Sequence, residues 1–90
     1  MAEQRPVTII NRLGLHARAA ARFVNEACAF EADISLERDG QTVNGKSIMG
    51  VMMLAASPGT ELVLHADGED AEAALDALET LIANRFDEEE

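Results

Sequence analysis

The sequence has few residues of the kinds that crosslink a chain or stack on nucleic-acid bases. It contains 1 Cys, no Trp, no Tyr and 3 Phe in 90 residues. A lone cysteine, Cys28, excludes an intramolecular disulfide and a cluster of metal-bound thiolates. The shortage of aromatic rings argues against binding of single-stranded nucleic acid by stacking. Because disulfides are absent, we expect a cytoplasmic protein.

Positive charge and long apolar runs are also scarce. The chain has 7 Lys and Arg against 17 Asp and Glu, a formal net charge of -10. An acidic protein repels nucleic acids and anionic membranes, so we expect neither as a partner. The longest apolar run, residues 48–56, is far shorter than the roughly 20 residues of a membrane-spanning helix. The polar residues 1–6 do not resemble a signal peptide.

The basic residues that are present gather near the start of the chain. Residues 1–22 contain four Arg and one Glu, whereas residues 69–90 contain nine acidic residues and one Arg. His16 lies in the basic segment. The first part of the chain is therefore the better candidate for binding an anion.

Two kinds of apolar period predict the secondary structure. Strands are predicted over residues 7–10, 33–38, 41–44 and 61–67, with Asp39-Gly40 as the hairpin turn. Helices are predicted from Ala17 to Cys28, over residues 48–54 with Ser47 as N-cap, and from Glu69 onward. This order, βαββαβα, indicates an α+β open-faced β-sandwich, a four-stranded antiparallel sheet covered on one face by three helices. We expect one domain over residues 1–90, with the acidic tail 87–90 disordered.

Periodicity also predicts which side chains are buried. Cys28 belongs to the apolar stripe of the first helix, and we expect Val51, Met53 and Leu54 in the core. His65 alternates outward from its strand and is expected at the surface. We therefore assign neither histidine nor Cys28 to a metal site. The acids Glu69, Asp70 and Glu72 suit the positive end of the last helix.

His16 is the main candidate for chemistry. It precedes the first predicted helix, whose unpaired N–H groups form an anion site, and Arg18 adds a guanidinium that can pair with phosphate oxygens. Gly14 allows the chain a close approach at this point. An imidazole is a neutral nucleophile near neutral pH, so these residues could support a transient phosphohistidine. The alternative is that His16 is a surface or capping residue and Arg18 an ordinary solvated side chain.

Two motifs resemble a known family. Residues 14–20, Gly-Leu-His-Ala-Arg-Ala-Ala, resemble the active-site signature of the HPr family, the histidine phosphocarriers of bacterial phosphotransferase systems. Residues 44–50, Asn-Gly-Lys-Ser-Ile-Met-Gly, resemble its second signature, around a regulatory serine. The resemblance covers residues 5–85. Ala19 stands where the family usually has Pro, and with residues 84–87 and the acidic tail it resembles the nitrogen-related branch more than the sugar-transport branch.

The resemblance implies a function for each motif. His16 would accept a phosphoryl group on Nδ1 from enzyme I charged by phosphoenolpyruvate and pass it to a IIA-type acceptor protein. Arg18 and the backbone N–H groups of residues 17–19 (Ala17, Arg18 and Ala19) would stabilise that group, and Ser47 would be modified by HPr kinase/phosphorylase. Partner docking would use Ala21, Ile48, Met49 and Met52. The chain would be a monomeric carrier without a cofactor, not a stand-alone enzyme.

Two other functions stay open at this point. The chain could be a regulatory protein-binding module that is controlled at Ser47 and has no phosphoryl relay. A small hydrolase that uses His16 as a base is poorly supported, because no paired carboxylate or nucleophile lies nearby in the sequence.

Overall fold

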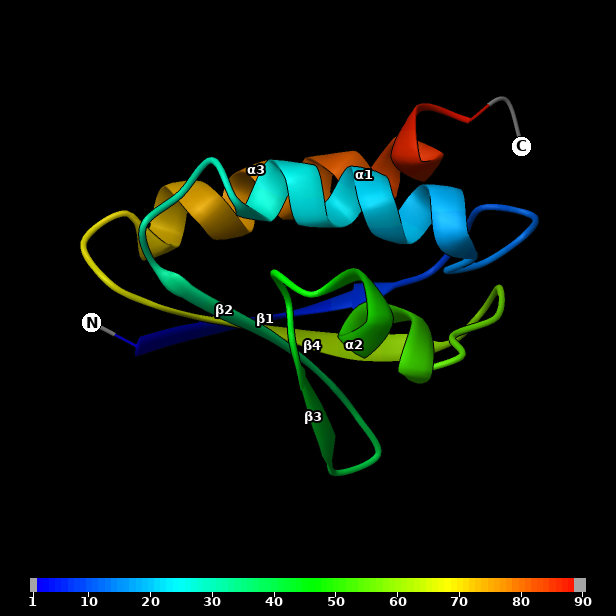
Figure 1. The fold of residues 1–90 in the computed structure, drawn as a ribbon, viewed down its shortest axis with the longest axis horizontal. Coiled ribbons are helices and arrows are strands. Elements are labelled where there is room, and N and C mark those ends of the chain that lie inside the picture. The colour runs from blue at the N-terminus through cyan, green and yellow to red at the C-terminus, as the bar shows by residue number, and fades with distance from the viewer. Residues whose placement is uncertain (1, 89–90) are drawn as a thin grey trace.

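The chain folds as an antiparallel sheet under a layer of helices (Figure 1). The computed structural model describes residues 2–88. The strands are β1 (Ala2–Thr8), β2 (Asp33–Arg38), β3 (Gln41–Asn44) and β4 (Glu61–Asp67), in the spatial order β1-β4-β2-β3, and every neighbouring pair is antiparallel. The helices are α1 (Ala17–Ala27), α2 (Ile48–Met53), α3 (Ala71–Ala83) and the short 3-10 helix η1 (Arg85–Asp87). The predicted α+β open-faced sandwich is confirmed.

The core lies between the sheet and the two long helices. Figure 1 shows α1 and α3 in one layer over the strands, while α2 packs against α1 and β3. Leu62 and Leu64 of β4 point into this core, and Leu75 and Leu78 meet them from α3. Strand residues alternate between the core and the open face of the sheet, as the period of two predicts. No helix of residues 2–88 is long and apolar enough to cross a membrane.

The first strand differs from the prediction. It begins at Ala2 and ends at Thr8, whereas the sequence pattern placed it over residues 7–10. Pro6 lies inside the strand, where it pairs with Val63 of β4. Since β1 is an edge strand, one side of its backbone has no strand partner and a proline is tolerated there.

Two side chains predicted in the core are exposed instead. Cys28 is the C-cap of α1, and its side chain is exposed at the end of the helix. Met53 is 68% exposed, whereas its neighbours Val51 and Leu54 are 0% and 2% exposed. Met53 is exposed because only one side of α2 faces the core, and Met53 lies on the other side.

Asp70 lies at the N-terminal end of α3 as its N-cap residue. Helix α3 begins at Ala71, and Asp70 makes no capping hydrogen bond with its side chain. Its carboxylate instead accepts hydrogen bonds from the backbone N–H groups of Glu31 and Ala32, both at 2.9 Å. These bonds join the start of α3 to the loop between α1 and β2.

The first two residues of the acidic tail, Asp87 and Glu88, contact the rest of the fold. Phe86 is 2% exposed and anchors η1 in the core. Asp87 forms an ion pair with Arg22 of α1, and Glu88 reaches the loop before that helix. Residues 89–90 lie outside the described part of the chain.

The contrast between Leu54 and Met53 can be measured. We expect Leu54→Ala to lower the free energy of unfolding by about 2–5 kcal/mol, because it leaves a cavity in the core. Met53→Ala removes a side chain that is 68% exposed and should change the free energy by less than about 0.5 kcal/mol. Urea denaturation of the two variants checks this, and equal losses would mean that Met53 is buried after all.

The Asp70 carboxylate should make stability depend on pH. The hydrogen bonds from the N–H groups of Glu31 and Ala32 lower the pKa of Asp70. Burial raises this pKa, whereas the positive charge of Lys46 lowers it further. The Asp70 carboxylate therefore binds a proton less tightly in the folded state than in the unfolded state. The ionised carboxylate stabilises the fold above the ordinary aspartate pKa of about 3.9, and this stabilisation is lost as pH falls through the lower pKa of the folded state. We expect the free energy of unfolding to be larger for the wild type than for Asp70→Asn at neutral pH, and the difference to become smaller in acid. Urea denaturation at several pH values checks this, and a difference that does not change with pH would contradict it.

Candidate functional site

His16 is the N-cap of α1. Its backbone is extended, with φ -75° and ψ 176°, and its carbonyl oxygen accepts the first helical hydrogen bond from the Ala20 N–H at 2.9 Å. The side chain folds back so that Nδ1 accepts a hydrogen bond from the Arg18 N–H at 3.3 Å. The imidazole therefore takes the place that Ser or Asp commonly has at a helix start.

The loop before His16 holds the ring in position. Gly14 has φ +69°, and a Cβ there would lie 2.5 Å from the carbonyl oxygen of Ala56. The next residue, Leu15, donates its N–H to the same oxygen at 2.9 Å. Only glycine fits both this backbone conformation and this contact. The link to the loop after α2 thus sets where α1 begins.

A carboxylate that the sequence analysis did not consider lies against the ring. His16 Nε2 donates to Glu88 Oε2 at 2.6 Å, and the second oxygen, Oε1, accepts from Nδ2 of Asn11 at 3.0 Å. Asn11 is 0% exposed, and its Nδ2 also donates to the Gly14 carbonyl at 2.8 Å. Neither residue belongs to a periodic pattern or to the two motifs, so only the tertiary structure reveals them.

The hydrogen-bond partners assign the protonation of the ring. Burial raises the pKa of Glu88, but the hydrogen bonds from Asn11 and His16 and the positive charge of Arg18 outweigh it and lower that pKa. Glu88 is therefore ionised and can only accept a hydrogen bond, which places a proton on Nε2 of His16. The Arg18 N–H donates to Nδ1, in agreement with this assignment. The lone pair that can attack an electrophile is on Nδ1.

Backbone donors lie at the start of α1 beside Nδ1, and Arg18 adds a cationic side chain on the same helical turn. The Arg18 side chain is exposed, and its guanidinium has no hydrogen bond or ion pair within residues 2–88. The N–H groups of Ala17, Arg18 and Ala19 all precede the first helical hydrogen bond, which starts at Ala20. Such groups stabilise an anion at a helix start. The arrangement can thus support a nucleophilic nitrogen and the negative group that it would receive.

Comparison with known proteins agrees with this chemistry. A family model described as "PTS HPr component phosphorylation site" matches residues 3–84. The chain belongs to the HPr family. It is thus a phosphocarrier protein of the phosphotransferase system, a group whose members act with the other proteins of that system.

Individual members of the HPr family match almost the whole chain. The phosphocarrier protein HPr of Cupriavidus necator is 54% identical over 97% of this chain and 98% of its own length. The phosphocarrier protein HPr of Pseudomonas aeruginosa is 56% identical over 93% of this chain and 94% of its own length. Among solved structures, HPr-C-His from Thermoanaerobacter tengcongensis has a TM-score of 0.93 at 45% identity and covers 98% of this chain and 99% of that one.

Some structural relatives are dimers. One is the HPr dimer from Thermoanaerobacter tengcongensis, which is 48% identical to this chain. The match covers 91% of this chain and 94% of that one, with a TM-score of 0.78. That assembly belongs to the relative, and the monomeric state expected for this HPr-family chain stays a prediction.

The second HPr-family motif forms the start of α2. Ser47 is the N-cap, as predicted, and its Oγ accepts a hydrogen bond from the Gly50 N–H at 3.1 Å. Next to it, Ile48, Met49 and Met52 are 43%, 77% and 40% exposed. Ala21 on the neighbouring α1 is half-buried. We call these four apolar residues the α1–α2 patch, and the exposed Met53, Leu13 and Ile10 were not assigned to it from the sequence.

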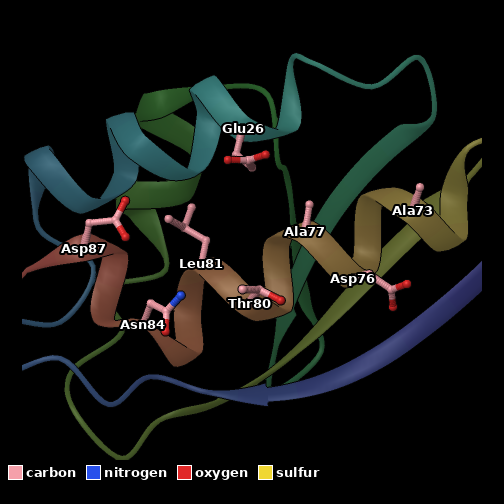
Figure 2. A pocket seen from close by; sticks show the side chains of 8 residues that line it. All are labelled: Glu26, Ala73, Asp76, Ala77, Thr80, Leu81, Asn84 and Asp87. Carbon is pink, nitrogen blue, oxygen red and sulfur yellow. The ribbon is translucent and has the colours of Figure 1, made fainter.

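Other candidates lie away from His16. His65, on the partly exposed side of β4 as expected, contacts Glu37 Oε1 at 2.8 Å through its Nε2. Within residues 2–88, no three His, Cys, Asp or Glu side chains lie close enough to hold a metal ion. A depression of about 580 Å³ between α1 and α3 is lined by Glu26, Asp76 and Asp87 among others and by no Lys or Arg (Figure 2). It is therefore unsuited to a phosphoryl group.

The close contact at Gly14 predicts a large effect of substitution. We expect Gly14→Ala to lower the free energy of unfolding by about 2–6 kcal/mol, because backbone strain of about 1–3 kcal/mol adds to overpacking of a similar size. Gly59→Ala is the matched control, since Gly59 has φ +90° with nothing within 4 Å of the added Cβ. It should show the strain alone. Equal losses in thermal unfolding would mean that the Ala56 contact is unimportant.

Proposed function

We propose that His16 accepts a phosphoryl group on Nδ1 from enzyme I charged by phosphoenolpyruvate and passes it to a IIA-type acceptor protein. The observation that carries this proposal is the position of Nδ1, which holds a lone pair at the N-terminus of α1 beside the Arg18 N–H. The family description as a phosphorylation site supports it.

The proposed transfer needs positioning and charge stabilisation more than covalent help. The Nδ1 lone pair forms the new bond to phosphorus as the bond between phosphorus and the donor breaks, and the donor keeps that electron pair. The phosphoryl oxygens then replace Nδ1 as acceptors for the first N–H groups of α1. The Arg18 guanidinium supplies the neutralising charge.

The α1–α2 patch is our proposed docking surface for both partners. Its exposed Ile48, Met49 and Met52 lie on the helix that packs against α1. Methionine side chains adapt to differently shaped surfaces, which suits a carrier that must bind a donor and an acceptor in turn.

Regulation at Ser47 is a second proposal, with HPr kinase/phosphorylase as the modifying enzyme. Crh, the catabolite repression HPr of Bacillus subtilis, is 50% identical to this chain. Its solution structure covers 89% of this chain and 95% of that one, with a TM-score of 0.67. That likeness favours a regulatory role as well. A phosphate on Ser47 would bring about 1.5 to 2 negative charges beside the exposed Ile48 and would oppose apolar docking.

Membership of the nitrogen-related branch, and a cytoplasmic location, are our proposals for the setting of this relay. Ala19 in place of the usual Pro and the tail after residue 84 support the branch assignment. Phosphorylation rates with the sugar-type and the nitrogen-type donor enzymes would separate the two branches.

The relay can be tested with the chain's 2 histidines. Incubation with enzyme I and phosphoenolpyruvate should add one phosphoryl group, stable in alkali and labile in acid. His16→Ala should abolish this label, because the accepting nitrogen is gone, while His65→Ala should retain it. Mass spectrometry gives the number of groups added.

Circular dichroism of both variants provides the control for folding. A label that persists in His16→Ala, or that disappears only in His65→Ala, would overturn the assignment.

A further inference from the structure

The contact between Glu88 and His16 lies on the side of the ring away from the nitrogen that is proposed to accept phosphorus. It joins residues 72 positions apart at 2.6 Å and engages the ring nitrogen opposite the one proposed to accept phosphorus. The Glu88 side chain is 17% exposed and that of His16 28%, so the contact is partly shielded from water. A charge-assisted hydrogen bond of this kind is among the stronger polar contacts in proteins.

Several independent contacts hold the carboxylate in place. The buried Asn11 binds Oε1 and thereby turns Oε2 toward the ring. Upstream in the tail, Phe86 is buried in the core and Asp87 pairs with Arg22. Glu88 thus extends from an anchored turn onto a preformed amide donor, and its position does not depend on His16 alone.

We propose that Glu88 is a positioning residue that occupies Nε2 of His16 and directs the incoming phosphoryl group to Nδ1. The inference rests on the proposed function and deepens it, because it explains how one of two chemically similar nitrogens is selected. Glu88 keeps the proton on Nε2, so that nitrogen has no lone pair to offer. Its negative charge also repels a phosphoryl group that approaches from that side.

Phosphoramidate, a small phosphoryl donor that needs no protein partner, can reveal which ring nitrogen reacts. The Nδ1 lone pair attacks phosphorus, the phosphorus–nitrogen bond of phosphoramidate breaks, and ammonia leaves with the electron pair of that bond. The ring becomes positively charged while Nε2 keeps its proton. The Glu88 carboxylate stabilises that charge through the hydrogen bond it already makes.

The test measures which nitrogen is phosphorylated. Wild-type protein and variants, all in a His65→Ala background so that His16 is the one imidazole, are treated with phosphoramidate and examined by ³¹P NMR, which separates the Nδ1 and Nε2 products. Two more glutamates follow Glu88 in the sequence. Glu88→Gln is therefore accompanied by a triple variant in which Glu88, Glu89 and Glu90 are all changed to Gln, so that no neighbouring carboxylate takes over. Glu69→Gln, an exposed charge on the loop before α3, is the matched control.

We expect the wild type and Glu69→Gln to form the Nδ1 product. The triple variant should raise the proportion of Nε2 product by about tenfold or more, as expected for loss of a charge-assisted hydrogen bond. In addition, ¹⁵N NMR near pH 8.5, where histidines are neutral, should show Nδ1–H appearing in the triple variant but not in the control. A merely structural role for Glu88 would move neither signal.

The proposal is overturned if all variants give the same product ratio, or if the wild type already reacts at Nε2. Failure of the relay itself would show separately, as a lack of label from enzyme I while the phosphoramidate ratio still responded to Glu88.

Discussion

The first N–H groups of α1 need acceptors, and the rest of the site is arranged around that need. A helix start leaves several donors without a partner inside the helix. Here the imidazole of His16 satisfies one of them through Nδ1, so the side chain with a nucleophilic nitrogen is also the cap of its own helix. The two interpretations of His16 that the sequence left open, cap or nucleophile, are therefore compatible. A phosphoryl group on Nδ1 would bring its own oxygens to the same donors.

The scaffold limits how far this cap can move. The backbone contact at Gly14 joins the loop before α1 to the loop after α2, and both loops lead directly into elements of one core. Side chains on rigid elements keep their geometry better than side chains on free loops. The partly exposed His16 ring therefore lies in surroundings that are already in place and need no rearrangement.

What could be predicted from the sequence was the structure encoded by local signals. Asp39-Gly40 predicted the β2–β3 hairpin, and Ser47 predicted the start of α2, because turn and cap residues act within a few positions. The start of β1 was missed because its pairing partner, β4, lies far along the chain. Cys28 and Met53 were wrongly predicted in the core, because the apolar period alone does not show which residues are exposed. Cys28 lies where α1 ends, and Met53 lies on the side of α2 that faces away from the core.

The site was predictable to the same extent. His16 and Arg18 could be singled out because they are close in sequence and fall in a recognisable motif. Asn11 and Glu88 could not, because their contact spans 77 positions and neither belongs to a pattern. Although no carboxylate lies near His16 in the sequence, the fold brings that of Glu88 to the ring. A single carboxylate hydrogen-bonded to the ring does not by itself create a site that activates water.

The ordering of the tail has a practical consequence for work with this protein. Glu88 touches the His16 ring, whereas Ala2 begins β1 at the far end of the sheet (Figure 1). A fluorophore or surface linker attached at Glu88 itself would thus lie beside the His16 ring and restrict access to it. Attachment at the start of β1 keeps such additions away from the ring.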